Sequence, residues 1–369
     1  MLNLIAPYNP TGYGNVGKNL LVSLYEEVCS NLHYENIGGF DGPPPLFLSL
    51  VKPVLKDSPD PTFFCWHQHA VDRILEQRAI KSLYTFFEVD RLPEYQVSSL
   101  NRLDHIFQPS QWGKEVLERS GVTVPISVLR PGIDRAIFNE AVEPTQIDGV
   151  SDNDFVIFVC GKWEVRKGYD ILLDVFHRAF RSDDNVKLVI NATNPVCVPG
   201  KFDGNDISRG WERFYEASPL GEASKIVIIK RRLDTQEELA KIMSRADMGC
   251  ALSRAEGWNL EAVEMLSMGK HVILSDVTAH KEFGDETGAT LAPYTDKEFA
   301  LERPFFDGSA LWDSPSKSDK IYIGELLRAG YNTWSSNGRL PVNDFGIKFA
   351  EQNTWKHTAK KILRHFYPI

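Results

Sequence analysis

The sequence has no apolar run long enough to span a bilayer, and its N-terminus lacks the basic and apolar pattern of a signal peptide. Its five cysteines are scattered without any C-x-x-C pairing, so the sequence indicates neither a disulfide framework nor a zinc site. The net charge of −9 argues against unselective binding to nucleic-acid phosphates. These features predict a cytoplasmic protein whose cysteines are mostly small buried apolar side chains.

The sequence does contain short apolar runs that alternate with helical stretches, a pattern that predicts parallel, doubly wound sheets. The runs expected to form strands lie at 2–6, 63–66, 83–87, 105–108, 155–159, 186–190, 226–229, 247–252 and 271–274. The length of 369 residues favours two domains. We expect domains at 1–142 and 150–347, a linker within 140–154, a C-terminal segment at 348–369, and irregular inserts at 195–222 and 293–317.

Residues 253–269 (SRAEGWNLEAVEMLSMG) contain two carboxylates, Glu256 and Glu264, on either side of a Gly-Trp-Asn turn. An apolar strand precedes this turn, and apolar residues at helical spacing follow it. Such a junction presents backbone amides and the positive end of a helix dipole at the carboxyl edge of a sheet, where α/β proteins bind phosphorylated ligands. We therefore expect Glu264 to accept hydrogen bonds from two vicinal hydroxyls, as a ribose presents, and Glu256 to reach a second polyol.

A simpler interpretation exists for the same charges. Two glutamates near a helix start could only complement the helix dipole, which is worth up to about 1 kcal/mol. Lys162 and Lys167, in the turn after the strand at 155–159, could be ordinary solvated lysines.

Further stretches accompany the carboxylate pair in a fixed order along the chain. They are FQPSQWG at 107–113 with SGV at 120–122, RPGID at 130–134 with Phe138, FVCGKWEVRKGYDILL at 158–173 and NTWKHTAKK at 353–361. With the E-x7-E spacing of Glu256 and Glu264, this series resembles the retaining glycosyltransferases of family 4, which have the GT-B fold.

The resemblance implies an α/β architecture of two Rossmann-like domains facing across a cleft, with a C-terminal helix that crosses back to the first domain. It implies transfer of a sugar, with retention, from a nucleotide diphosphate donor such as a UDP- or GDP-sugar. The acceptor would be a free hydroxyl on a glycan, a lipid-linked or small molecule, or a modified nucleic-acid base. Neither a cofactor nor a protein-bound metal is implied, because cations and a helix N-terminus stabilise the leaving diphosphate.

The resemblance also assigns roles to residues of the second domain. Lys162 and Lys167 would hold the donor diphosphate, although the family usually has arginine at the position of Lys162. The amides near Asn259 and Leu260 would hold phosphate oxygens, while Glu264 binds the ribose and Glu256 the donor sugar.

In the first domain, a glycine-rich turn at 10–17 is expected to lead into a helix from 19 to 28 and to approach the ligand. Many family members carry a histidine after the strand at 83–87, where this chain has Glu88. His67 and His69 are reserve candidates, and their spacing of two could also bind a metal.

The expected site is summarised by role. The catalytic residues are Glu88, Glu256, Lys162 and Lys167. The donor is bound by Gly14, Lys162, Lys167, Glu256, Gly257, Trp258, Asn259, Leu260 and Glu264, and the cleft is further lined by Gly12, His67, His69, Asp90 and Arg231. Two alternatives remain. The first is a GT-B nucleotide-sugar epimerase or glycan phosphorylase, although a phosphorylase needs a pyridoxal-binding lysine and a longer chain. The second is a catalytically silent sugar-nucleotide-binding protein.

Overall fold

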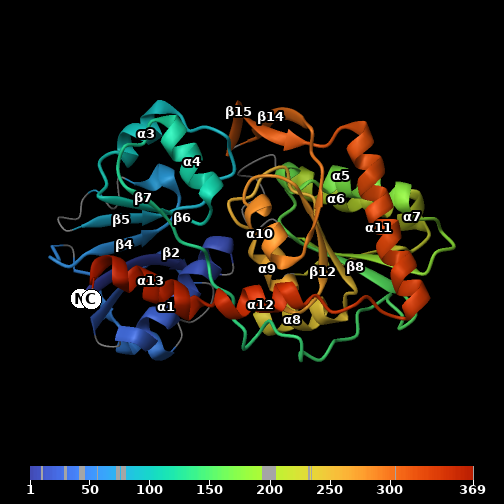
Figure 1. Ribbon diagram of the computed structural model, residues 1–369, viewed down its shortest axis with the longest axis horizontal. Coiled ribbons are helices and arrows are strands. Elements are labelled where there is room, and N and C mark those ends of the chain that lie inside the picture. Colours follow the sequence, from blue (N-terminus) through green and yellow to red (C-terminus); the bar gives the residue numbers. More distant parts are fainter. Residues whose placement is uncertain are drawn as a thin grey trace. The chain divides into compact units, whose positions relative to one another are not determined.

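The structure is a computed structural model that describes residues 1–9, 11–28, 31–40, 46–55, 57–71, 75, 80–192, 205–231, 233, 235–303 and 305–368. Cys29, Cys197 and Arg232 lie outside these residues. The chain forms two compact units (Figure 1). Unit 1 comprises Met1–Asp134 and Gln352–Ile369, and unit 2 comprises Arg135–Glu351.

Unit 1 contains a parallel sheet with the strand order β3-β2-β1-β4-β5-β6-β7. Its apolar strands were predictable because their side chains are buried on both faces. The polar and glycine-containing β2 was not predicted, and neither were the short β3 and β7. The strands are β1 (Leu2–Tyr8), β2 (Leu32–Phe40), β3 (Lys52–Pro53), β4 (Thr62–Cys65), β5 (Lys81–Tyr84), β6 (His105–Gln108) and β7 (Ile126–Val128).

The glycine-rich segment of unit 1 is helical, which corrects the expected turn at 10–17. Helix α1 (Gly12–Val28) begins directly after Thr11, whose hydroxyl accepts a hydrogen bond from the Gly14 amide at 3.2 Å, as an N-cap residue does. A Cβ at Gly14 would lie 1.9 Å from the Asn9 carbonyl oxygen, and one at Gly17 would lie 2.1 Å from the Pro7 carbonyl oxygen. These two glycines therefore let the helix pack against the end of β1.

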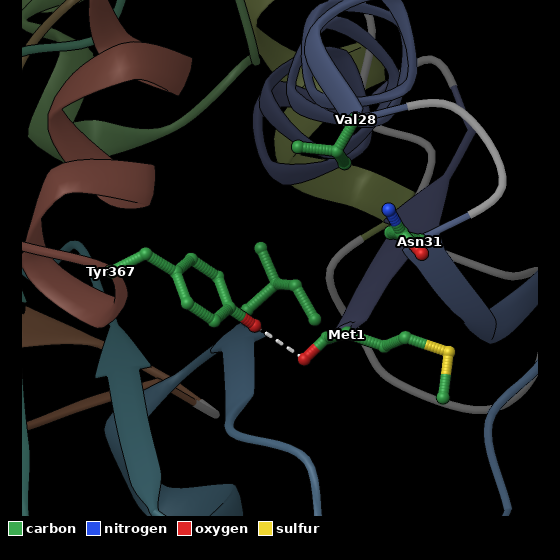
Figure 2. A pocket seen from close by; sticks show the side chains of 5 residues that line it. Met1, Val28, Asn31 and Tyr367 are labelled. Carbon is green, nitrogen blue, oxygen red and sulfur yellow. Dashed lines mark hydrogen bonds between the residues drawn. The ribbon is translucent and has the colours of Figure 1, made fainter. Parts of the chain in front are cut away.

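The C-terminal helix α13 (Trp355–Phe366) belongs to unit 1, as the resemblance implied. It packs on α1, and the Thr358 hydroxyl donates to the Arg130 carbonyl oxygen at 3.0 Å. Just beyond the helix, the Tyr367 hydroxyl donates to the Met1 carbonyl oxygen, so that the two ends of the chain meet in a pocket also lined by Val28 and Asn31 (Figure 2). Unit 1 also contains helices α3 (Glu94–Leu100) and α4 (Gln111–Ser120).

Unit 2 contains a second parallel sheet, with the strand order β10-β9-β8-β11-β12-β13. Helix α5 packs against α11 (Figure 1). A large apolar core contains side chains of the sheet and of both helices. Its strands are β8 (Phe155–Gly161), β9 (Val186–Ala192), β10 (Ile226–Ile228), β11 (Met248–Ala251), β12 (His271–Ser275) and β13 (Thr290–Ala292). Its main helices are α5 (Tyr169–Ala179), α8 (Gln236–Arg245), α9 (Leu260–Ser267), α10 (His280–Thr287), α11 (Lys317–Asn337) and α12 (Asp344–Gln352).

The segment expected as a linker at 140–154 lies within unit 2, which already begins at Arg135. The reason is local bonding: the Ser244 hydroxyl donates to the Val142 carbonyl oxygen, and the Thr145 amide donates to the Lys241 carbonyl oxygen. The polar composition of this stretch therefore reflects a surface segment attached to α8.

The two inserts expected to be irregular contain regular structure in the part of the chain that the structure describes, which excludes 195–204 of the first insert. The first holds α6 (Asn205–Glu216) and α7 (Pro219–Glu222), and the second forms an antiparallel hairpin of β14 (Asp296–Glu302) and β15 (Phe306–Ser314). Figure 1 shows this hairpin as a sheet of its own beside the main sheet of unit 2. Within the described residues, no helix is long and apolar enough to cross a membrane.

Candidate active site

The candidate site of unit 2 lies where two neighbouring central strands end. Strand β11 pairs in parallel with β8, so the turns after both strands meet at the carboxyl edge of the sheet. Gly168 joins these turns: its φ is +73°, and a Cβ there would lie 2.0 Å from the Leu252 carbonyl oxygen. Glycine is required on both counts, because other residues rarely adopt this conformation and no space exists for a side chain.

Glu256 is at the centre of a buried charge cluster formed by these two turns. Its Oε1 lies 2.7 Å from Lys167 Nζ, and its Oε2 lies 3.0 Å from an Arg166 guanidinium nitrogen. The Ser253 hydroxyl also donates to Oε1 at 2.7 Å. Only 6% of the Glu256 side chain and 11% of the Lys167 side chain is exposed, so this is an interior ion pair rather than a solvated surface contact.

The cluster remains charged despite its burial. Burial raises the pKa of Glu256, but Lys167 and Arg166 outweigh it and hold that pKa well below its ordinary value. Burial lowers the pKa of Lys167, but Glu256 and Glu261 outweigh it and raise the net value. Both groups are therefore ionised at neutral pH, and Lys167 is a true cation at the carboxyl edge of the sheet.

Lys162 occupies a more open place in the same turn. Its Nζ lies 3.5 Å from Glu164, and 37% of its side chain is exposed. Glu164 also pairs at 3.0 Å with Arg166, which is buried and donates to the Ala255 carbonyl oxygen at 2.8 Å. Arg166 was not predicted as a site residue. Its position directly before Lys167, in the turn at 162–168 (the cation turn), could have indicated it.

The Gly-Trp-Asn turn leads into α9 as expected, with Asn259 in an unusual backbone conformation of φ 97° and ψ 82°. The Asn259 side-chain oxygen accepts from the Ala262 amide at 3.2 Å and so caps the helix. Beyond this cap, amides of the first helical turn have no acceptor within the helix, so they are available to an anion. The Trp258 ring is buried against Phe283, with ring centroids 5.1 Å apart, so it supports the turn from within.

His280, at the start of α10, fixes the conformation of Asn259 and was not predicted. Its Nε2 lies 2.9 Å from the side-chain nitrogen Nδ2 of Asn259, and its Nδ1 lies 3.1 Å from the Ser275 carbonyl oxygen. The amide must donate to Nε2, so Nδ1 carries the proton and the ring is neutral. Burial lowers the pKa of His280 to about 4, which agrees with a neutral ring.

Glu264 lies on α9 and is buried, together with Gly257 in the preceding turn. Burial raises the pKa of the Cys160 thiol at the end of β8, and the negative charges of Glu261 and Glu264 raise it further. Glu264 therefore lies close to the end of β8. The structure therefore brings Glu264, Glu256 and Lys167 to one edge of the sheet. Arg231 is different, because it is exposed and pairs with Glu238 on α8.

Several candidate residues of unit 1 lie around Tyr13, at the carboxyl edge of its own sheet. The Tyr13 hydroxyl, from α1 between Gly12 and Gly14, donates to the Phe86 carbonyl oxygen at 2.9 Å, and its ring centroid lies 4.3 Å from that of His67. Burial raises the pKa of Tyr13, and the charge of Glu88 adds to this effect.

His67 and His69 lie beside Tyr13, whereas Asp90 lies near the C-terminal end of α4, where its carbonyl oxygen accepts from the Arg119 guanidinium at 3.4 Å. His67 and His69 stack with ring centroids 5.0 Å apart. Asp90 lies 3.6 Å from Arg91 in an ion pair at the surface. Among the residues that the structure describes, no three His, Cys, Asp or Glu side chains form a group that could hold a metal ion.

Comparison with known proteins identifies the architecture. Anabaena HepE, solved with UDP and glucose, has a TM-score of 0.67 at 13% identity, and the match covers 100% of both chains. The sucrose-phosphate synthase of Thermosynechococcus elongatus has a TM-score of 0.69 at 12% identity, over 99% of this chain and 98% of that one. The fold is GT-B. Identities this low establish the shared fold alone.

A sequence match adds to the shared fold. Residues 154–302 match the model of a family described as Glycosyl transferases group 1. The pneumococcal O-GlcNAc transferase GtfA, solved with UDP and GlcNAc, has a TM-score of 0.55 at 14% identity; the match covers 84% of this chain but 57% of that one. No curated protein sequence matches this chain. The family match and the GT-B fold together support a glycosyltransferase.

The neutral, buried His280 predicts that unit 2 loses stability on mild acidification. The unfolded chain takes up this proton near pH 6.5, whereas the folded chain takes it up only near pH 4. The unfolded state therefore binds more protons between these values, and the free energy of unfolding should fall as the pH drops through this window, by about 3 kcal/mol in total. The contribution of Glu256 is lost only at lower pH, below its ordinary pKa of about 4.5.

Urea denaturation of wild type and His280→Gln at pH 7, 6, 5 and 4 measures this effect. Wild type should lose more stability than the variant over this range, and His271→Gln, a substitution on β12, serves as the matched control. Parallel curves for wild type and His280→Gln would contradict the assignment of a neutral His280.

Proposed function

We propose that this protein is a retaining glycosyltransferase that moves a sugar from a nucleotide diphosphate donor to an acceptor hydroxyl. The observation that carries the proposal is the buried cluster of Lys167, Arg166 and Glu256 beside the N-terminus of α9. A cation fixed at this edge of a parallel sheet, next to free helix amides, suits a diphosphate. The UDP and UDP-glucose in the HepE structures support a nucleotide-sugar donor, with UDP- or GDP-sugars as first candidates.

Charge stabilisation of the leaving group is the main chemistry that unit 2 can supply. Lys167 and Lys162, with the amides of the α9 N-terminus at Asn259 and Leu260, would hold the phosphate oxygens on which negative charge grows as the sugar departs. Burial makes Lys167 effective, because the interaction is screened little by water. Gly257 and the buried Trp258 would contribute through the backbone of the turn, and Glu264 would accept from the ribose hydroxyls.

Glu256 can still accept from the donor sugar. A carboxylate offers about four lone-pair positions. Lys167 and Ser253 occupy those of Oε1, and Arg166 occupies one on Oε2. One position on Oε2 is therefore left for a sugar hydroxyl, which agrees with the role proposed for Glu256.

In unit 1, we assign Glu88 to the transfer step as the proposed catalytic carboxylate, with Gly14 contacting the donor. Gly12, His67, His69 and Asp90 would line the site, and Arg231 would do so from unit 2. Retention requires the acceptor hydroxyl to attack from the face that the phosphate leaves. The acceptor is a molecule with a free hydroxyl, in the classes that the resemblance implies.

A ligand screen tests the proposal directly. UDP-, GDP-, ADP- and CMP-linked sugars are added to the purified protein, and the thermal midpoint is recorded. A donor at one hundred times its dissociation constant stabilises the protein by about 2.7 kcal/mol, which corresponds to roughly 5–10 °C for a unit of this size. No shift with any donor would refute the proposal.

The donor that binds is then used for turnover, with product configuration read by NMR. Inversion at the anomeric carbon would exclude the retaining mechanism. Binding without transfer or donor hydrolysis would favour a silent nucleotide-sugar-binding protein, and sugar isomerisation without an acceptor would favour an epimerase.

A further inference from the structure

The hairpin of β14 and β15 contacts the candidate site through carboxylates on one face. Strand residues two and four apart lie on the same face, and Glu298, Ala300 and Glu302 of β14 follow this spacing. Ala300 is buried at 1% exposure, whereas Phe299 and Leu301 between them point outward at 72% and 55%. Glu298 is paired in register with the buried Trp312 of β15. The inner face of the hairpin therefore presents two acids toward the body of unit 2.

Glu302 holds the backbone of the cation turn. Its Oε1 accepts from the Val165 amide at 2.8 Å and its Oε2 accepts from the Arg166 amide at 3.2 Å. Both carboxylate oxygens are thus used on two successive amides, immediately before Lys167. Charge-assisted hydrogen bonds of this kind are about twice as strong as neutral ones.

Glu298 acts on the second turn through Arg254, which precedes Glu256 by two residues. Arg254 Nε donates to Glu298, while its other nitrogens donate at 2.7 Å to the Val165 carbonyl oxygen and to both oxygens of Asp170. Both backbone polar groups of Val165 are therefore bonded: its amide donates to Glu302, and its carbonyl oxygen accepts from Arg254. The side chain of Arg254 is only 6% exposed, so this network is part of the interior.

We propose that Glu302, supported by Glu298, is a positioning residue for donor binding, which holds the turn at 162–168 so that Lys167 meets the donor diphosphate. The hairpin contacts this turn and lies outside the main sheet, so the turn that carries Lys167 is held from an element other than its own strand β8. This inference rests on the proposed function. Displacement of a charged group by about 1 Å can cost on the order of 100-fold in rate, so a loosened turn should weaken the diphosphate interaction in particular.

Calorimetric titration of UDP, GDP and ADP, and of the matching nucleosides, tests this role. Glu302→Ala should weaken the binding of the preferred nucleoside diphosphate by on the order of tenfold, with little change for the nucleoside, because the nucleoside has no phosphate to meet Lys167. Glu302→Gln keeps one acceptor oxygen and should recover part of the loss. Asp307→Asn is the matched control, since Asp307 lies on the same hairpin and bonds to the amide of Ser309.

Hydrogen exchange gives a second readout that needs no ligand. The amides of Val165 and Arg166 should exchange faster in Glu302→Ala than in Asp307→Asn. Unchanged exchange, or an equal loss of nucleoside and diphosphate affinity, would overturn the proposal. If wild type binds a diphosphate and Glu302→Ala binds it equally well, the positioning role alone fails. If wild type binds none of the three diphosphates, the proposed function fails and the positioning role fails with it.

Discussion

Glu256→Gln is expected to cost unit 2 about 3–5 kcal/mol of unfolding free energy, because it removes the carboxylate from a buried cluster, which leaves the Lys167 cation without its ion-pair partner and Arg166 with Glu164 alone. The same substitution should weaken the binding of the nucleotide sugar but not of the free nucleoside diphosphate, because Glu256 addresses the sugar. Urea denaturation measures the first effect, and calorimetric titration of both ligands measures the second.

Two other glutamates provide the controls for this experiment. Glu237→Gln makes the same chemical change at an exposed position in the first turn of α8 and should alter stability by less than about 0.5 kcal/mol. Glu264→Gln should weaken both ligands, because Glu264 addresses the ribose that they share. An unchanged stability in Glu256→Gln would mean that the ion pair contributes nothing, and equal losses for the two ligands would mean that Glu256 does not address the sugar.

Lys167→Met is expected to weaken binding of the donor diphosphate by roughly 1.5–3 kcal/mol, about tenfold to 150-fold, through loss of a charge-assisted contact. Turnover should fall further, since charge grows on the leaving group during transfer. Methionine replaces the apolar stem that passes beneath Gly161, where a glycine Cβ position lies 3.3 Å from Lys167 Cε, so the packing is largely kept. Titration and steady-state kinetics give the two values.

Lys230→Met is the matched control, because Lys230 is 57% exposed and pairs with Glu216 at the surface. Lys162→Arg should retain most activity, since the charge remains in the more open position. Wild-type diphosphate affinity in Lys167→Met would remove Lys167 from the donor site, and the helix N-terminus would then be the main phosphate contact.

The strands of both sheets were largely predictable because burial on both faces leaves a direct trace in the sequence. Runs such as those at 63–66 and 155–159 are apolar at every position, and the structure places them in central strands. The turn between β11 and α9 was predictable for a similar local reason, since an apolar strand, a glycine turn and a helical spacing follow one another within a few residues. These predictions are confirmed.

The segments whose structure was predicted wrongly have local sequence patterns that are compatible with more than one backbone conformation. Glycines at 12, 14 and 17 suit an open loop as well as a helix packed closely on a strand, and only the approach of Asn9 and Pro7 selects the helix. The insert at 293–317 forms an antiparallel hairpin of two strands that pair with each other, and Glu302 and Glu298 connect this hairpin to Val165 and Arg254 in the turns of the site.

The sequence by itself determined the two α/β units and the order of their strands along the chain. It also determined the positions of Lys162, Lys167 and Glu256 in turns beside the sheet, and of Glu264 in the helix that follows. Tertiary structure decided how these charges are used. In the folded chain, Lys167 and Arg166 both pair with the Glu256 carboxylate, and His280 accepts a hydrogen bond from the Asn259 side chain. Local periodicity reports which face of an element is buried, whereas ion pairs between turns about ninety residues apart depend on which strands become neighbours in the sheet.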